Sequence, residues 1–177
     1  MFSQKSGDFD MALASYAEFV AVGTRLSRFR DELGSWFDWR REVAAVLMQM
    51  ASIYDSRDDD AAAIDCLQRY RSLVDSVYRA EGQGWALRGR IRSRALLAIY
   101  LSAAGRGPEG RALLTQVETD VGALCANGAR SRRALEVCAK LYDLLARAHT
   151  AIGAIGLAEV CARSAAEAMR RARDLEQ

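Results

Sequence analysis

The sequence predicts an all-α protein, and three observations support this fold class. The 177 residues contain a single proline, Pro108, so long helices can form almost without interruption. Alanine, leucine and arginine dominate, whereas β-branched residues are sparse and never form alternating runs. A layout of turn, small residue and core-sized residues also recurs about every 48 residues.

Four segments share this layout. In each, a small residue follows the turn residue by five positions, and core-sized residues follow four and seven positions later. We expect the small residue to let the next helix approach closely and the larger ones to fill the groove between helices. The turns are Gly7, Asp58, Gly105 and Gly153; the small residues are Ala12, Ala63, Gly110 and Ala158; the core columns are Tyr16, Leu67, Leu114, Ala162 and Phe19, Tyr70, Val117, Ala165.

The helices before the last three turns carry matching apolar stripes. Their members lie three or four residues apart, which places each stripe on one helical face. Each stripe together with the following turn and helix predicts a helical hairpin. The stripes are Leu47, Met50, Ala51 and Tyr54; Leu97, Ala98 and Leu101; and Tyr142, Leu145, Ala146 and His149.

The first helix is expected over residues 8–30, with the pattern of the second member of a hairpin and no partner before it. Ser35 with Asp38 three residues on predicts a capping box for the second helix, which ends near Arg57. The unpartnered helix is either a cap or the remainder of a truncated hairpin. We favour a fragment of a longer solenoid, because uncapped repeats expose apolar faces.

Five further helices follow from breaks in the sequence. Asp58–Asp60 begin the third helix, since acidic residues suit the positive end of a helix. The segment 81–84 (EGQG) precedes a fourth helix that ends at Gly105, and Pro108 opens the fifth. The fifth ends at Asn127 and Gly128, the sixth runs to about Ile152, and the seventh runs from about Ala154 to the C-terminus.

The small-residue and aromatic columns and the glycine turn resemble the tetratricopeptide repeat family, most plainly in LARAHTAIGAIGLAEVCARSA from Leu145 to Ala165. The period exceeds the family's roughly 34 residues. It is similar to that of long-helix relatives found in bacterial signalling and transcription regulators. The resemblance implies a right-handed α-α superhelix (a solenoid) of seven antiparallel helices, with three full hairpins and one unpartnered helix, in one domain over residues 1–177.

Composition limits the compartment and the partners. The formal net charge of +2 by itself indicates neither a nucleic acid nor a membrane as partner. The start of the chain lacks the layout of a signal peptide, and no apolar run approaches the length of a membrane span. Cys66, Cys125, Cys138 and Cys161 are isolated, which favours small buried residues in a reducing compartment. We therefore expect a cytoplasmic protein.

No set of residues predicts catalysis, a metal or a cofactor. The only histidine, His149, lies in an aromatic column and is expected to be packed. Cys138 precedes it by eleven residues on the same helix, which separates the two by about 16 Å. Asp58–Asp60 lacks the alternating ligands of a calcium loop, and the glycines at 82–89 lack the strand and lysine of a phosphate loop. We expect that the protein is not an enzyme.

The resemblance implies a concave groove lined by the first helix of each hairpin. Its outward residues form a mixed surface that suits an extended peptide or a partner helix. The asparagines and lysines do not form the carboxylate clamp of chaperone-binding relatives. The predicted groove residues are Met48, Ser52, Asp55, Arg92, Ala95, Ser102, Asp143, Arg147 and Thr150.

The same first helices carry arginines and tryptophans near their N-terminal ends. Because such helices stack side by side in a solenoid, these residues predict a basic edge that could dock carboxylates or phosphates. The alternative is a solvated edge balanced by neighbouring acids, with the tryptophans filling the core. The predicted edge comprises Trp36, Arg40, Arg41, Trp85, Arg88, Arg90, Arg132 and Arg133.

Three hypotheses on function follow from these surfaces. The first is a non-catalytic protein-interaction module, a scaffold or sensor segment of a larger bacterial regulator, that binds a peptide or partner helix in the groove. The second is binding of a nucleic acid or polyanion along the basic edge. The third is self-assembly into homo-oligomers through uncapped solenoid ends.

Overall fold

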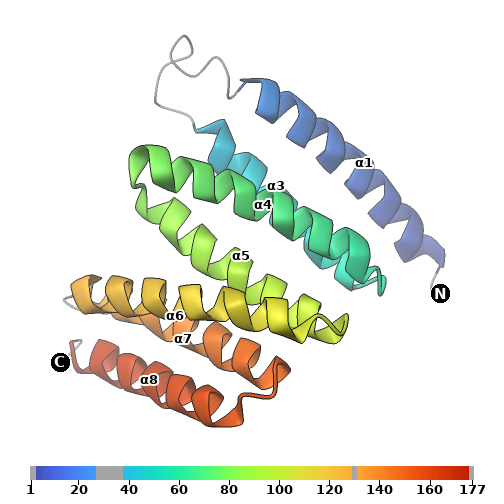
Figure 1. The fold of residues 1–177 in the computed structure, drawn as a ribbon. Helices are drawn as coiled ribbons and strands as arrows, with labels where there is room; N and C mark the ends of the chain where they lie inside the picture. The colour runs from blue at the N-terminus through green and yellow to red at the C-terminus, as the bar shows by residue number, and fades with distance from the viewer. Residues whose placement is uncertain (1–2, 27–37, 129–130, 176–177) are drawn as a thin grey trace. The chain divides into compact units, whose positions relative to one another are not determined.

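The computed structural model describes residues 3–26, 38–128 and 131–175, and this part of the chain is helical apart from short turns. It contains seven α-helices and no strand (Figure 1). This confirms the predicted all-α class, and the described residues contain as many helices as the sequence predicted. The helices are α1 (Ser3–Leu26), α3 (Trp39–Asp55), α4 (Asp60–Glu81), α5 (Gly84–Ala103), α6 (Gly107–Gly128), α7 (Arg132–Ala151) and α8 (Ile155–Asp174).

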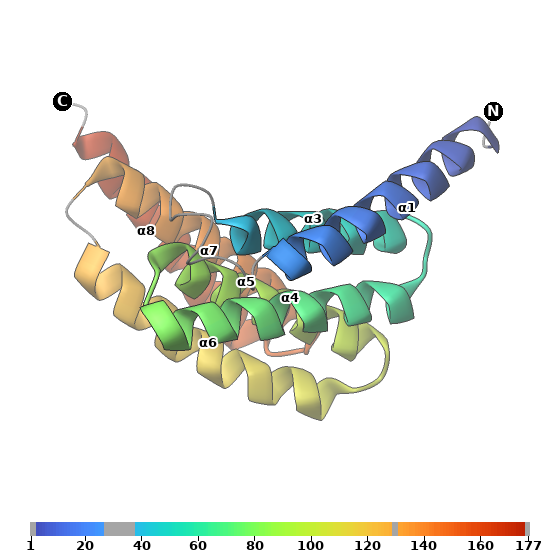
Figure 2. The ribbon, with the colours of Figure 1, turned by 90° about the horizontal axis from the view of Figure 1, so that it is seen from above.

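Two compact units divide the chain at residues 1–76 and 77–177. In the first unit α1 packs antiparallel along α3, as the views in Figures 1 and 2 show. A guanidinium nitrogen of Arg57 lies 2.6 Å from a carboxylate oxygen of Asp10 at one end of this pair. Near the other end the ring centroids of Phe19 and Trp39 are 6.0 Å apart.

The second unit holds two hairpins, α5–α6 and α7–α8. Each helix packs against the next along the chain, and α5 also packs against α7. Its core includes side chains with at most 2 % of their surface exposed on three of these helices, among them Leu97, Leu114 and Leu145. Consecutive packing of antiparallel helices fits the predicted hairpins.

The three hairpin turns share one backbone structure. At each turn a residue with positive φ follows the helix, and two crossed hydrogen bonds close the helix end in a Schellman motif. The φ values are 56° at Asp58, 76° at Gly105 and 77° at Gly153. The longer bonds run from the N–H of Asp59, Arg106 and Ala154 to the carbonyls of Tyr54, Leu101 and His149, at 3.0, 2.7 and 2.8 Å. The inner bonds run from the N–H of Asp58, Gly105 and Gly153 to the carbonyls of Asp55, Ser102 and Thr150, each at 3.0 Å.

The small-residue column is also confirmed at these three turns. Ala63, Gly110 and Ala158 are all buried. A Cβ atom at Gly110 would lie only 2.9 Å from the carbonyl oxygen of Ala98, so α5 and α6 touch backbone to backbone. The column therefore marks a close approach of helices, as the sequence pattern predicted.

Two predicted boundaries are wrong. α1 is already helical at Ser3, so Gly7 lies inside the helix and is not a turn. One glycine disfavours a helix by only about 1 kcal/mol, which does not stop it where no proline follows. The second helix begins at Trp39, because Asp38 is itself the N-cap and its carboxylate accepts the N–H of Arg40 at 3.1 Å. The prediction of a capping box with Asp38 three residues into the motif is therefore wrong. Ser35, its other member, lies outside the described residues.

The core columns hold in α4 and α6 but not in α8. Leu67 and Leu114 are at most 1 % exposed, whereas Ala162 at the matching position is exposed. The physical reason is that no helix follows α8 among the described residues. The outer side of α8 is thus open, although its turn matches the other two.

Candidate interaction surfaces

α5 and α7 lie side by side in the second unit and point the same way. The hydroxyl of Ser102 at the end of α5 donates a 2.7 Å hydrogen bond to the carbonyl of Ala151 at the end of α7. Ser102 and Thr150 are the same position of the two turn motifs, so the two helix ends are level. This arrangement of first helices is the one that the repeat pattern predicted for this part of the chain.

The α7 residues that were predicted to line the groove are accessible. Asp143, Arg147 and Thr150 are all exposed, and Lys140 extends the same row by one turn. Spacings of three and four residues place these side chains on one face. The row is polar and carries both charges.

The predicted groove face of α5 is partly wrong. Arg92 is exposed, but Ala95 is 0 % exposed and cannot contact a partner. α5 packs against both α6 and α7, so it buries more than one face and leaves only a narrow strip open. The half-buried Leu96 and Ile99 lie on this strip instead. The α5 part of the surface is therefore more apolar than the sequence pattern indicated.

The remaining groove residues belong to α3 in the first unit. Ser52 and Asp55 are exposed, and Met48 is half-buried. These positions are accessible on α3, as expected for groove residues.

The predicted basic edge loses its continuity, because several of its arginines pair with acids. Arg40 Nε donates to the carboxylate of Asp38 at 2.9 Å, and Arg132 Nε donates to Glu136 at 2.8 Å. Arg41 is exposed, and Trp36 lies outside the described residues.

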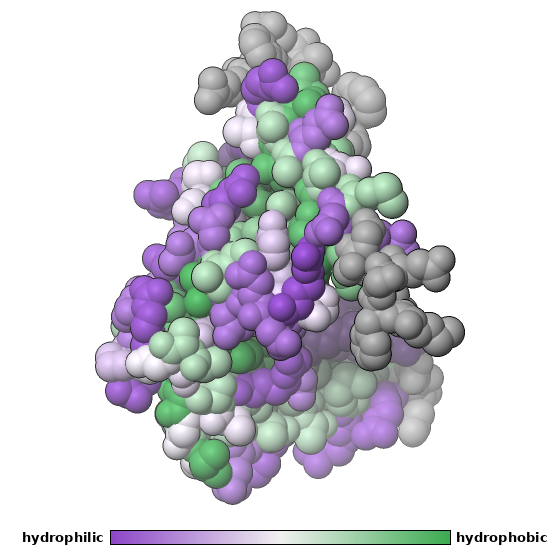
Figure 3. Space-filling view, turned by 90° about the vertical axis from the view of Figure 1, so that its right-hand side faces the viewer, coloured by the Kyte–Doolittle hydropathy of each residue, from purple (hydrophilic) through white to green (hydrophobic). Residues whose placement is uncertain are grey.

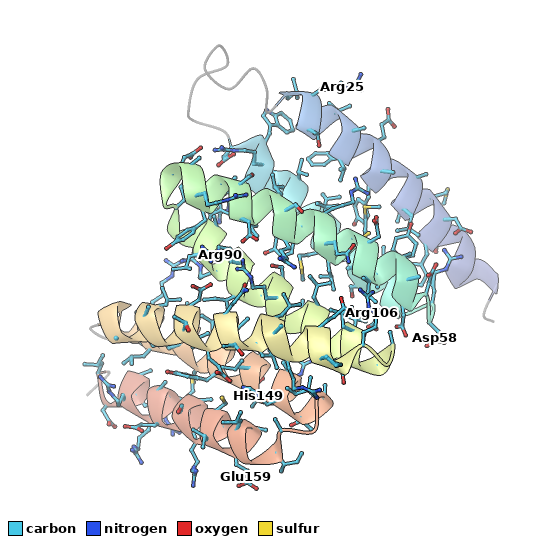
Figure 4. The ribbon with its side chains drawn as sticks, in the orientation of Figure 1. Arg25, Asp58, Arg90, Arg106, His149 and Glu159 are labelled. Atoms are coloured by element: carbon cyan, nitrogen blue, oxygen red, sulfur yellow. The ribbon has the colours of Figure 1, made fainter. Side chains whose placement is uncertain are left out.

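Arg90 is not an edge residue. It projects from α5 (Figure 4), and a terminal nitrogen of its guanidinium lies 3.4 Å from Asp120 on α6. The guanidinium also stacks 4.6 Å from the ring centre of Tyr78. Arg94 lies one turn further along α5, is 5 % exposed and approaches the same carboxylate at 3.7 Å. A pair at i and i+4 faces one side of the helix, which here is the side of α6.

Trp85, another predicted edge residue, is half-buried, and its indole N–H donates to the side-chain oxygen of Gln83. Arg88 and Arg133, by contrast, are exposed and line one cavity. Of the predicted edge, these two arginines are the ones that the second unit brings together.

His149 is packed, as predicted. Its side chain is 2 % exposed, and its Nε2 lies 3.0 Å from a carboxylate oxygen of Glu118. Figure 4 labels His149 among the helices of the second unit. This contact links α7 to α6 and sits directly at the α7–α8 turn, whose Schellman bond uses the His149 carbonyl. The geometry gives the imidazole a structural role at the hairpin.

The structure brings together two cysteines that the sequence showed as isolated. Cys125 on α6 and Cys138 on α7 interact through a thiol hydrogen bond beside Tyr142. They line a cavity of about 330 Å³ between α6, α7 and α8. Burial, followed by the hydrogen bond to Cys138, raises the pKa of Cys125 to about 12. A thiol with such a pKa stays protonated at neutral pH and is a poor nucleophile.

Within residues 3–26, 38–128 and 131–175 no cluster of three or more His, Cys, Asp or Glu side chains could hold a metal ion. Of the helices described, none combines the length and the apolar character needed to cross a bilayer. No family model, curated protein or solved structure matches the chain.

Proposed function

We propose that the protein is a non-catalytic interaction module that binds an extended peptide or a partner helix across α5 and α7. The observation that carries this proposal is the parallel packing of α5 and α7, fixed by the Ser102–Ala151 hydrogen bond, which sets two exposed strips side by side. One strip is basic and apolar, and the other is polar with both charges. A peptide that presents an acid, an apolar anchor and a base in turn would match them.

The buried chemistry favours a binding role over a catalytic one. His149 is enclosed beside Glu118, and the raised pKa of Cys125 keeps its thiol protonated at neutral pH. A general base needs access to its substrate, which the buried His149 lacks, and a nucleophilic thiol needs to ionise, which the raised pKa of Cys125 opposes.

The same proposal includes the long-period tetratricopeptide-like solenoid, a cytoplasmic location and a place in a larger bacterial regulator. What supports the solenoid is the identity of the three Schellman turns at spacings of 47 and 48 residues and the stacking of α5 on α7. The location and the regulator follow from the family resemblance and from composition alone.

The double variant Arg92→Glu/Arg147→Glu tests the groove. Both arginines are exposed, so reversing their charges leaves the core intact while it repels an acidic anchor. The matched control is Arg111→Glu/Arg163→Glu, which changes the same charges at exposed positions of α6 and α8. We expect affinity capture with the wild type and the control to recover the same partners and the groove variant to lose them. Equal recovery by all three proteins would refute the groove.

A second candidate function is self-assembly through α8. Five large apolar side chains of this helix and its end are 42–57 % exposed: Ile155, Leu157, Val160, Met169 and Leu175. Met169 matches Val121 of α6, which is 0 % exposed, so a position that is covered in one hairpin is open in the next. Strongly apolar side chains reach the surface in the lower part of Figure 3, and Figure 4 shows Glu159 projecting outward from α8.

Sedimentation over a range of concentrations tests this candidate. If α8 is an interface, the wild type associates with rising concentration and Met169→Glu remains monomeric. A wild type that stays monomeric at high concentration would exclude self-assembly by this surface. Binding along the whole basic edge is less well supported, because Arg40, Arg90 and Arg132 already pair with acids.

A further inference from the structure

A second cavity in the second unit has a composition suited to a ligand. It lies where α5, α6 and α7 meet and has a volume of about 380 Å³, within the range of about 300–1,000 Å³ typical of small-molecule sites. Its lining comes from all three helices: Arg88, Leu124, Ser131, Arg133, Ala134, Val137 and Cys138.

The cavity is positively charged. Arg88 and Arg133 line it from two different helices, and none of the described residues that line it is acidic. Within the described chain neither guanidinium has an acidic partner, in contrast to Arg90 and Arg132. Because each guanidinium carries a positive charge, an oxyanion in this cavity would be attracted to both arginines.

The N-terminus of α7 adds to the positive potential. Ser131 caps the helix by accepting the N–H of Ala134 at 3.3 Å, and the first turn contains no acidic residue. The first turns of α4 and α6 contain Asp60 and Glu109. No acidic residue in the first turn of α7 therefore offsets the positive end of its helix dipole. This end of the helix borders the cavity that both arginines line.

The rest of the lining is apolar. Leu124, Ala134 and Val137 offer methyl groups, and Cys138 is buried. Such a wall would bind the body of a ligand through its apolar surface while the arginines hold its charge.

We propose that this cavity binds a small organic anion, whose phosphate or carboxylate lies between Arg88 and Arg133 and whose apolar body contacts Leu124 and Val137. The observation that carries the proposal is that two arginines, for which the described residues offer no acidic partner, line one cavity with an apolar wall. Binding of such an anion does not depend on peptide binding across α5 and α7.

Titration of the full chain with phenyl phosphate, benzoate and inorganic phosphate tests the proposal, with binding followed by calorimetry and by NMR of leucine and valine methyl groups. We expect saturable binding of phenyl phosphate or benzoate, with shifts at the methyl groups of Leu124 and Val137. Inorganic phosphate has no apolar body and should bind more weakly without comparable methyl shifts. The tighter of the two aromatic ligands identifies the preferred anion.

The variant Arg88→Gln/Arg133→Gln removes both charges, and Arg106→Gln/Arg111→Gln is the matched control because both of its arginines are exposed on or beside α6. We expect the first to weaken aromatic-anion binding by about tenfold or more, since charge-assisted hydrogen bonds are lost, and the control to bind as the wild type does. A circular dichroism spectrum establishes that each variant is folded. Absence of saturable binding, equal affinity for all three anions, or equal loss in both double variants would overturn the proposal.

Discussion

Replacement of Gly110 by alanine tests the close approach of α5 and α6. The new Cβ would lie 2.9 Å from the carbonyl oxygen and 3.4 Å from the Cα of Ala98, both backbone atoms that no rotamer change can move. Overpacking of this kind costs about 1–3 kcal/mol. The better helix propensity of alanine returns about 1 kcal/mol at most. We therefore expect the free energy of unfolding to fall by up to about 2 kcal/mol.

The matched control lies on the same helix. A Cβ at Gly122 meets nothing within 4 Å, and the residue is exposed, so Gly122→Ala should raise the free energy of unfolding by about 0.5–1 kcal/mol. Both variants exchange the same residue types in α6, so their effects on the unfolded chain largely cancel. Urea unfolding followed by circular dichroism measures the difference. If Gly110→Ala proved as stable as Gly122→Ala, the backbone contact inferred between α5 and α6 would be wrong.

Three further predictions concern the turns, the buried charges and the thiols. Gly153→Ala should lower the free energy of unfolding by about 1–2 kcal/mol because φ at this position is positive. Asp58→Gly should change the free energy of unfolding by no more than about 0.5 kcal/mol, since aspartate tolerates a positive φ. Equal losses in urea titrations would contradict the shared turn. Asp120→Ala should cost about 3 kcal/mol in the same assay because it removes the carboxylate that the buried Arg94 approaches. Arg94→Met/Asp120→Leu should cost less, and the reverse order would refute the ion-pair account. The pKa of Cys125 is raised to about 12 by burial, so its stabilising effect is complete below pH 9 and is lost towards pH 12. The wild type should therefore lose stability more steeply than Cys125→Ala between pH 9 and 11, and parallel profiles would contradict this cause.

Much of the fold was predictable because its determinants are local. Positive φ at Gly105 and Gly153 follows from glycine at the end of an apolar stripe, and Asp59 accepts the N–H of Ala62 at 3.1 Å near the start of α4, as acidic residues there predicted. The period set the positions of the buried Ala63 and Gly110. Neighbouring residues determine turns, caps and periodicity, so the hairpins could be inferred without knowledge of any long-range contact.

The surfaces were less predictable because they depend on which helix packs on which side. Ala95 is buried only because α5 contacts two helices at once, which spacing along α5 does not reveal. Arg90 forms an ion pair with Asp120, which lies thirty residues later in the chain, and so does not belong to the basic edge. One signal was present: Asp120 interrupts the apolar row of α6 three residues after Val117, where a buried partner for an arginine could have been expected. Cys125 and Cys138 contact each other from different helices, and their spacing in the sequence does not predict this contact.

Site-specific photo-crosslinking tests the central claim of groove binding most directly. A benzophenone amino acid at Arg92 or Arg147 would lie on the proposed surface, and one at Thr115 or Arg163 would lie on exposed positions of α6 and α8 outside it. We expect the two groove positions to form a covalent adduct with the same partner and the two control positions to form none. Equal adducts from all four positions, or adducts only from α6 and α8, would contradict a binding groove on α5 and α7.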